Sequence, residues 1–238
     1  MDLKKIFWNN TALSRSFENI SLLVVFFLVA YANYMVFLAV PNERIMGPVQ
    51  RIFYFHVGCA VATYMAVAFL FFASLGYLTT RSALMDILGE SATEIALVFC
   101  SIVMATGMIW GKAAWNTAFR WEPRLVSFLI LLVILVAIVV LRRFGNPQKT
   151  PLNSAVMGIL AAINVPIVVF SVKLLPASSQ LHPQVVQNRG LRDPLFVKAM
   201  IIGIIAMCCF QLILLWIRVR LGLAESQLDE LETEKLVN

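Results

Sequence analysis

The sequence predicts an all-α, polytopic membrane protein whose six transmembrane helices form a single membrane domain over residues 1–238. Hydrophobic residues make up 61% of the chain and charged residues only 13%, whereas soluble domains are about half apolar and about a quarter charged. Six apolar runs are each long enough, or nearly so, to cross a hydrocarbon core that needs about 20 helical residues. In chain order these runs are Ile20–Val40, Val57–Leu78, Ile95–Ile109, Leu125–Leu141, Ser154–Val172 and Ala199–Ile217.

The first run is expected to be a retained membrane anchor. It follows the basic residues Lys4, Lys5 and Arg15, and its segment Ala30–Ala32 has the small-residue pattern of a signal-peptidase site. Apolar sequence continues without a break to Val40. We therefore expect this segment to stay in the lipid rather than to be cleaved.

The composition of the six runs argues against an ion-coupled transporter or pump and against thiol redox chemistry. None of the six contains Asp, Glu, Lys, Arg or His, whereas ion-coupled transporters and proton pumps usually need an ionisable group within a span. The cysteines all lie inside predicted spans and form no Cys-x-x-Cys pair, so we expect packing residues rather than redox sites. They are Cys59, Cys100, Cys208 and Cys209.

Six crossings place both termini on one side of the membrane, together with residues 79–94 and 142–153. Lys and Arg are divided almost evenly between the two sides, so the positive-inside rule discriminates weakly. The short loop at 142–153 is basic and has no acidic residue, which favours cytoplasmic termini. The cytoplasmic tail, residues 221–238, has leucines spaced among acidic residues and is expected to form a short solvated helix.

Acidic residues are divided unevenly. The side with residues 41–56, 110–124 and 173–198 carries nine Lys and Arg against three acidic residues, which accounts for the whole net charge of +6. Such a surface indicates an anionic ligand. Contact of snorkelling side chains with membrane lipid explains the same pattern, so both interpretations stay open at this point.

The two histidines of the chain, His56 and His182, both fall on this positively charged side. His56 lies just before the second span and His182 lies between the fifth and the sixth. The fold can therefore bring both imidazoles to a similar depth at the membrane surface.

Three of the five tryptophans crowd into the segment between the third and fourth spans, again on the histidine side. An interfacial position near a helix end explains Trp110. It does not explain Trp115 and Trp121 with Phe119 between them, because a loop rarely exposes so much aromatic surface without a cover. A planar apolar ligand with an anionic edge and a central metal would use the aromatic rings, the cations and two neutral imidazoles, and heme fits this description.

A family resemblance rests on the same segment. Residues 110–124 read WGKAAWNTAFRWEPR and resemble the tryptophan-rich signature of the heme-handling proteins of cytochrome c maturation, especially the six-helix CcmC type. Residues Arg51–Val57 resemble the first histidine segment of that family, and Asn164–Pro183 resemble the second. The resemblance covers about residues 45–220.

The resemblance implies that His56 and His182 are the two axial ligands of a non-covalently bound heme b. It implies an extracytoplasmic, tryptophan-rich, heme-facing loop over residues 110–124, and we expect Arg51 and Arg124 to be the cations that meet the propionates. The residues expected to contact heme in this segment are Trp110, Gly111, Trp115, Phe119, Trp121, Glu122 and Arg124.

The resemblance also implies a location and partners. The chain is expected in the cell inner membrane, where it would deliver heme to a periplasmic heme chaperone and act with ABC transporter subunits of the cytochrome c maturation system. Nucleic acid is not an expected partner. An enzyme is not expected either, because no nucleophile and base pair and no paired carboxylates occur in register.

This sequence departs from the family pattern at several positions. Phe119 stands where a tryptophan is usual, and keeps stacking ability without the indole donor. Asn116 replaces a glycine, Glu122 replaces an aspartate, and Gly58 stands where proline is common. Leu174–Leu175 replace an aromatic pair near His182. We expect heme binding to be retained despite these changes.

Two other functions fit parts of the pattern. An electron-transfer protein of the cytochrome b type would also use two histidines, but that class generally places them inside its helices. An ABC-type permease subunit for heme or another small molecule would need a cytoplasmic coupling helix. The segment 79–94, with Leu84, Ile87 and Leu88 on one face, is a candidate for that helix, although an interfacial amphipathic segment explains it better.

Overall fold

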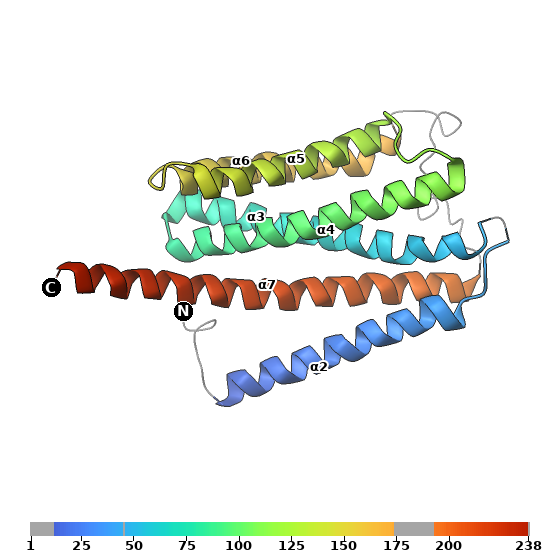
Figure 1. Ribbon diagram of the computed structural model, residues 1–238, viewed down its shortest axis with the longest axis horizontal. Helices are drawn as coiled ribbons and strands as arrows, with labels where there is room; N and C mark the ends of the chain where they lie inside the picture. Colours follow the sequence, from blue (N-terminus) through green and yellow to red (C-terminus); the bar gives the residue numbers. More distant parts are fainter. Residues whose placement is uncertain (1–11, 45, 174–192, 238) are drawn as a thin grey trace.

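The computed structural model describes residues 12–44, 46–173 and 193–237. Across these residues six helices are long and apolar enough to cross a membrane, so the predicted fold class is confirmed. The helices run back and forth along one common direction (Figure 1). They are α2 (Ala12–Tyr34), α3 (Arg51–Thr80), α4 (Ala83–Trp115), α5 (Pro123–Phe144), α6 (Thr150–Phe170) and α7 (Pro194–Val237).

Short elements extend or precede these helices. A π-helical turn, Met35–Ala39, continues α2, and the 3-10 turn Pro48–Gln50 leads into α3. Another 3-10 turn, Ser171–Lys173, ends α6. Proline lies in the first turn of α5, at Pro123, where its missing N–H leaves no hydrogen bond unmade.

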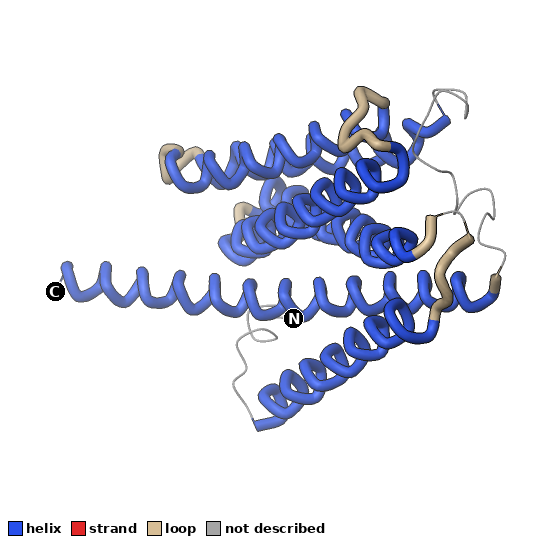
Figure 2. Tube along the Cα trace, turned by 45° about the vertical axis from the view of Figure 1, so that its right-hand side comes forward, coloured by secondary structure: helices blue, strands red, loops and turns tan. Residues whose placement is uncertain are grey.

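The bundle has two ends with different contents. One end carries His56, the segment between α2 and α3, and the loop 116–122 between α4 and α5, and we call it the histidine end. Figure 2 shows both connecting segments at this end. The opposite end carries the tight α3–α4 turn, the α5–α6 turn and the C-terminal part of α7 (Figure 1).

Helix α3 is the centre of the bundle, because it packs against α4, α6 and α7. Two glycines let α3 and α7 approach closely at the histidine end. A Cβ added at Gly58 would lie 2.9 Å from the carbonyl oxygen of Gly203, and one added at Gly203 would lie 3.2 Å from that of Tyr54. In lipid, such close backbone approach supplies packing energy that the hydrophobic effect does not. The contact fixes the turn of α3 that carries His56.

Ion pairs concentrate at the opposite end. Arg142 Nη2 lies 2.6 Å from Asp86 Oδ1, and its Nη1 lies 3.6 Å from Glu90 Oε2. Arg218 Nε lies 2.5 Å from Glu94 Oε2 and joins α7 to α4 in the same way. These bonds stabilise charged helix turns that lie beyond the apolar runs.

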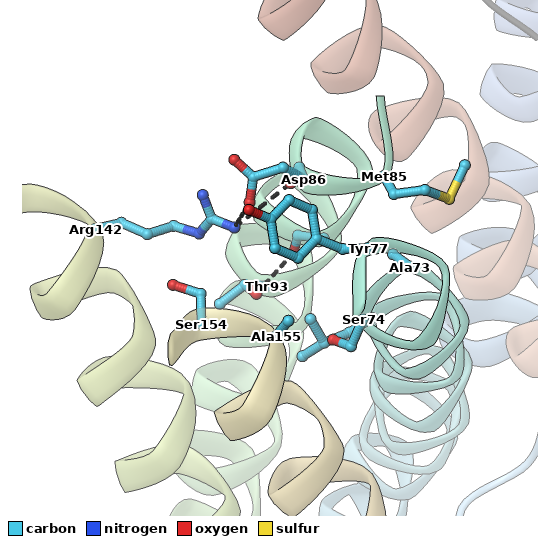
Figure 3. Close-up of a pocket in the computed structure, with 11 residues that line it drawn as sticks. Ala73, Ser74, Tyr77, Met85, Asp86, Thr93, Arg142, Ser154 and Ala155 are labelled. Carbon is cyan, nitrogen blue, oxygen red and sulfur yellow. Dashed lines mark hydrogen bonds and ion pairs between the residues drawn. The ribbon is translucent and has the colours of Figure 1, made fainter. Parts of the chain in front are cut away.

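A small pocket lies beside Arg142, between α3, α4, α5 and α6 (Figure 3). Its volume of about 10 Å³ has room for no more than one water molecule. The hydroxyls of Ser74 and Ser154 and the Nε of Arg142 are buried there without a hydrogen-bond partner in the described part of the chain. The pocket is too small for an organic ligand and is far from His56 along the bundle.

The helices run longer than the apolar runs that predicted them. Residues 79–94 are not a loop, because the chain turns at Arg81 and Ser82 and α4 begins at Ala83. The candidate coupling helix is thus the first part of α4. The tail is likewise not a separate helix but the continuation of α7. At about 1.5 Å per residue the 44 residues of α7 span about 66 Å, about twice a hydrocarbon core of about 30 Å, so hydropathy identifies only its apolar part.

Candidate functional site

His56 lies on the second turn of α3, where it faces α4. Its Nδ1 is 3.0 Å from the hydroxyl of Thr106, and its ring centroid is 6.1 Å from that of Trp110. Gly107 lies beneath the ring, since a Cβ added there would be 3.1 Å from His56 Cε1. One helix thus contributes the imidazole, and the next provides the surface on which it rests.

The expected position of His56 is corrected in one respect. The sequence places it in a loop before the second span, whereas α3 begins at Arg51 and includes it. The 3-10 turn at Pro48–Gln50 starts the helix early. His56 still lies close to the histidine end, and its side chain is partly exposed.

Trp110 is the centre of an aromatic cluster around His56. It is only 3% exposed. Its ring centroid lies 5.8 Å from that of Phe53 and 5.5 Å from that of Trp115. Tilted and edge-to-face rings at these distances attract one another. The indole Nε1 of Trp110 has no hydrogen-bond acceptor among the described residues, so a buried donor remains available beside the imidazole.

The segment expected as a loop over residues 110–124 is helical as far as Trp115. Helix α4 ends there because Asn116 adopts a left-handed conformation, with φ 56°, and its side-chain Oδ1 accepts a 2.7 Å hydrogen bond from Lys112 Nζ. The chain then folds back over the helix. A Cβ at Gly111 would lie 2.9 Å from the carbonyl oxygen of Thr117, so only glycine leaves room for this return.

The loop itself presents a second aromatic pair. Phe119 and Trp121 meet edge to face with ring centroids 5.4 Å apart. Trp121 is 81% exposed, in contrast to the buried Trp110. The two tryptophans therefore have different physical roles. One packs inside the bundle, and the other offers an apolar face to whatever lies against the histidine end.

Three charged residues complete the site. Arg124, in the first turn of α5, is close enough to act electrostatically on His56. Arg51 donates to Asn42 Oδ1 at 3.2 Å through Nη2, and its Nε is buried without a partner among the residues described. Glu122 is buried, with its carboxylate 3.8 Å from the guanidinium of Arg120.

His182 lies outside the described residues, as do Leu174 and Leu175. The elements that flank this segment are the 3-10 turn Ser171–Lys173 at the end of α6 and the start of α7, and both lie at the histidine end (Figure 1). The pairing of His56 with His182 therefore stays a prediction.

Comparisons with known proteins decide the family. A family model described as Heme exporter protein C matches residues 7–234 of the chain. The chain belongs to that family. It is 33% identical over 146 residues to heme exporter protein C of Bradyrhizobium diazoefficiens, and 28% identical over 160 residues to that of Escherichia coli. A ccmC-like mitochondrial protein of cytochrome c biosynthesis from Marchantia polymorpha is 30% identical over 159 residues.

These alignments cover only part of each chain. They take in 61% of this chain and 55% of the Bradyrhizobium protein, 65% and 64% for Escherichia coli, and 66% and 68% for Marchantia. Membership of the heme exporter protein C family confirms the resemblance drawn from the tryptophan-rich segment. Together with the six helices, it makes the chain a multi-pass membrane protein.

The sequence of this heme exporter protein C family member does not predict two residues that contact His56. They are Thr106 and Gly107. Both lie inside the third apolar run, where a hydroxyl and a missing side chain are common and carry no signal of their own. Their helical register could have drawn attention to them, since Thr106 lies four residues before Trp110 and hence on the same face. The register within α4 does not show which residue of another helix these two residues contact.

Proposed function

We propose that this chain binds heme b non-covalently at the extracytoplasmic membrane surface, with His56 and His182 as the two iron ligands. It then delivers the heme to a periplasmic heme chaperone for cytochrome c maturation, together with ABC transporter subunits of that system. The observation that carries the proposal is the seating of His56 against Trp110 at the bundle end that also exposes Trp121. The names of the relatives, heme exporter protein C and a protein of cytochrome c biosynthesis, support it.

The described residues have the properties that a porphyrin needs. Trp121 offers an exposed apolar face on which a flat ring can pack. Arg124 acts electrostatically on His56, and the Nε of Arg51, earlier on α3, has no partner among the described residues, so we assign both cations to the propionate carboxylates. Trp110 adds an indole donor without an acceptor in the described structure. Bound heme would supply an iron for His56 and His182 to ligate, and neutral imidazole is an ordinary ligand for it.

The same features support delivery rather than catalysis. A protein that hands heme on must bind it where a water-soluble partner can reach it, and the exposed Trp121 of the loop 116–122 meets that need. The net charge of +6 on this side of the membrane attracts an anionic porphyrin. We propose cytoplasmic termini, which place the loop, His56 and His182 outside the cytoplasm.

A titration with hemin tests the proposal. The purified protein is expected to bind one hemin with a Soret band distinct from that of free hemin. Replacing Trp121 by alanine is expected to weaken binding about tenfold, because a lost aromatic contact of about 1.4 kcal/mol changes the dissociation constant by that factor. Absorbance and quenching of tryptophan fluorescence provide the measurement.

Trp216→Phe is the matched control for Trp121→Ala. Trp216 lies on α7, where its Nε1 donates to Glu18 Oε1 at 2.7 Å, away from the histidine end. Its replacement is expected to leave hemin affinity unchanged. Equal affinities of the Trp121 variant and the unaltered chain would remove the loop from the binding site, and absence of hemin binding altogether would refute the proposed function.

A further inference from the structure

We propose that Thr106 holds His56 in the tautomer that carries its proton on Nδ1, so that Nε2 is the nitrogen presented to a ligand. Gly107 makes room for the ring in this position. The part of the inference that concerns iron rests on the proposed heme binding. The part that concerns the tautomer is a property of the chain without heme.

The argument begins with the single hydroxyl proton of Thr106. Its Oγ1 lies 2.7 Å from the carbonyl oxygen of Ile102, one helical turn earlier. Two oxygen atoms at that distance repel unless a proton lies between them, and the carbonyl has none to give. The hydroxyl of Thr106 is therefore the donor in this bond, and its only proton is used there.

The bond to His56 then has a fixed direction. Because the Thr106 hydroxyl has no second proton, its oxygen can only accept across the 3.0 Å to His56 Nδ1. The imidazole is therefore the donor in this bond, and its proton lies on Nδ1. In a neutral imidazole with its proton on Nδ1, the lone pair is on Nε2.

Steric contact holds the ring in the same place. A Cβ at Gly107 would lie 3.1 Å from His56 Cε1, which is closer than ordinary contact. Trp110, on the next turn of α4, also packs against the ring, with 6.1 Å between the ring centroids. Positions 106, 107 and 110 share one face of the helix. The hydrogen bond to Thr106 determines which ring nitrogen of His56 carries the proton. Gly107 and Trp110 determine the orientation of the ring.

A hydrogen-bond partner of this kind affects how well a histidine binds metal. It fixes the tautomer in advance and raises the basicity of the coordinating nitrogen, and its loss typically lowers metal affinity about 10- to 100-fold. Thr106 is thus a positioning residue, which acts on the ligand through His56 without touching it.

The tautomer can be measured without heme. With nitrogen-15-labelled histidine and His182→Ala, the only labelled ring is that of His56. Nuclear magnetic resonance of the heme-free protein in lipid at neutral pH is expected to show a protonated Nδ1 and an unprotonated Nε2. Thr106→Val, which removes the acceptor, is expected to abolish this single form, and Thr106→Ser is expected to retain it. An unprotonated His56 Nδ1 in the protein that retains Thr106 would overturn the inference.

Hemin titration gives the second readout. Thr106→Val is expected to raise the hemin dissociation constant about tenfold or more, whereas Thr106→Ser stays close to the unaltered protein. Gly107→Ala is expected to weaken binding as well, because it displaces the imidazole. The matched control is Thr93→Val on the same helix, since the Thr93 hydroxyl makes the same kind of bond, to Gly89 O at 2.8 Å, and has no histidine beside it.

The two readouts separate the inference from the proposed function. If the unaltered protein bound no hemin, the heme proposal would fail. The role of Thr106 would still stand if His56 carried its proton on Nδ1 in the unaltered protein and lost this preference in Thr106→Val. If Thr106→Val and the control Thr93→Val had the same His56 tautomer and the same hemin affinity, Thr106 would have no positioning role.

Discussion

Replacing His56 by alanine is expected to lower hemin affinity more than about 100-fold. Loss of a hydrogen-bond partner of a metal ligand already costs about 10- to 100-fold, and loss of the ligand itself costs more. Helix α3 should persist, because alanine is a strong helix former. The measurement is a titration of the purified variant with hemin, followed at the Soret band.

Rescue by a free ligand distinguishes a lost ligand from a damaged fold. His56→Gly leaves a space lined by Gly107 and Trp110, and added imidazole is expected to restore the Soret band of the unaltered protein. Tight hemin binding by His56→Ala, with an unchanged spectrum, would exclude His56 as a ligand.

Replacing Trp110 by alanine is expected to have the largest effect on stability. Its indole is 3% exposed and contacts Phe53, His56 and Trp115. Large-to-small changes of this kind cost about 3–5 kcal/mol in soluble cores. We expect about 3 kcal/mol, because apolar transfer contributes little between helices in lipid and lost contacts account for most of the cost.

Trp121 provides the contrast for Trp110. Its side chain is 81% exposed, so Trp121→Ala is expected to change the free energy of unfolding by less than about 0.5 kcal/mol while it weakens hemin binding. Unfolding of each variant in mild detergent, with circular dichroism as the probe, measures both values. Equal stability of the two alanine variants would contradict the division of roles between the buried and the exposed indole.

The six helices follow from hydropathy because a chain in lipid must satisfy its backbone within each span, and helices do so. Their ends do not follow from it. The apolar run that predicts α4 stops at Ile109, yet the helix continues to Trp115 and stops where Asn116 takes a left-handed conformation. After glycine, asparagine is the residue that most readily adopts this conformation at the end of a helix.

The sequence predicts on which side of the membrane the site residues lie. It does not predict which residues they contact. Counting spans places His56 and the tryptophan-rich segment at the same end of the bundle, as the structure does. That His56 rests on Thr106 and Gly107 depends on how α3 packs against α4, which one sequence does not encode. The different burial of Trp110 and Trp121 has the same origin, because it depends on where α4 ends and the chain turns back at Gly111.

Electron paramagnetic resonance of the ferric heme complex tests most directly whether His56 and His182 share one iron. The unaltered protein is expected to give the low-spin signal of an iron with two imidazole ligands. His182→Ala is expected to convert this signal to the high-spin signal of an iron with one protein ligand, in a protein that still binds hemin through His56. A low-spin signal with two imidazoles that persists in His182→Ala would contradict the account.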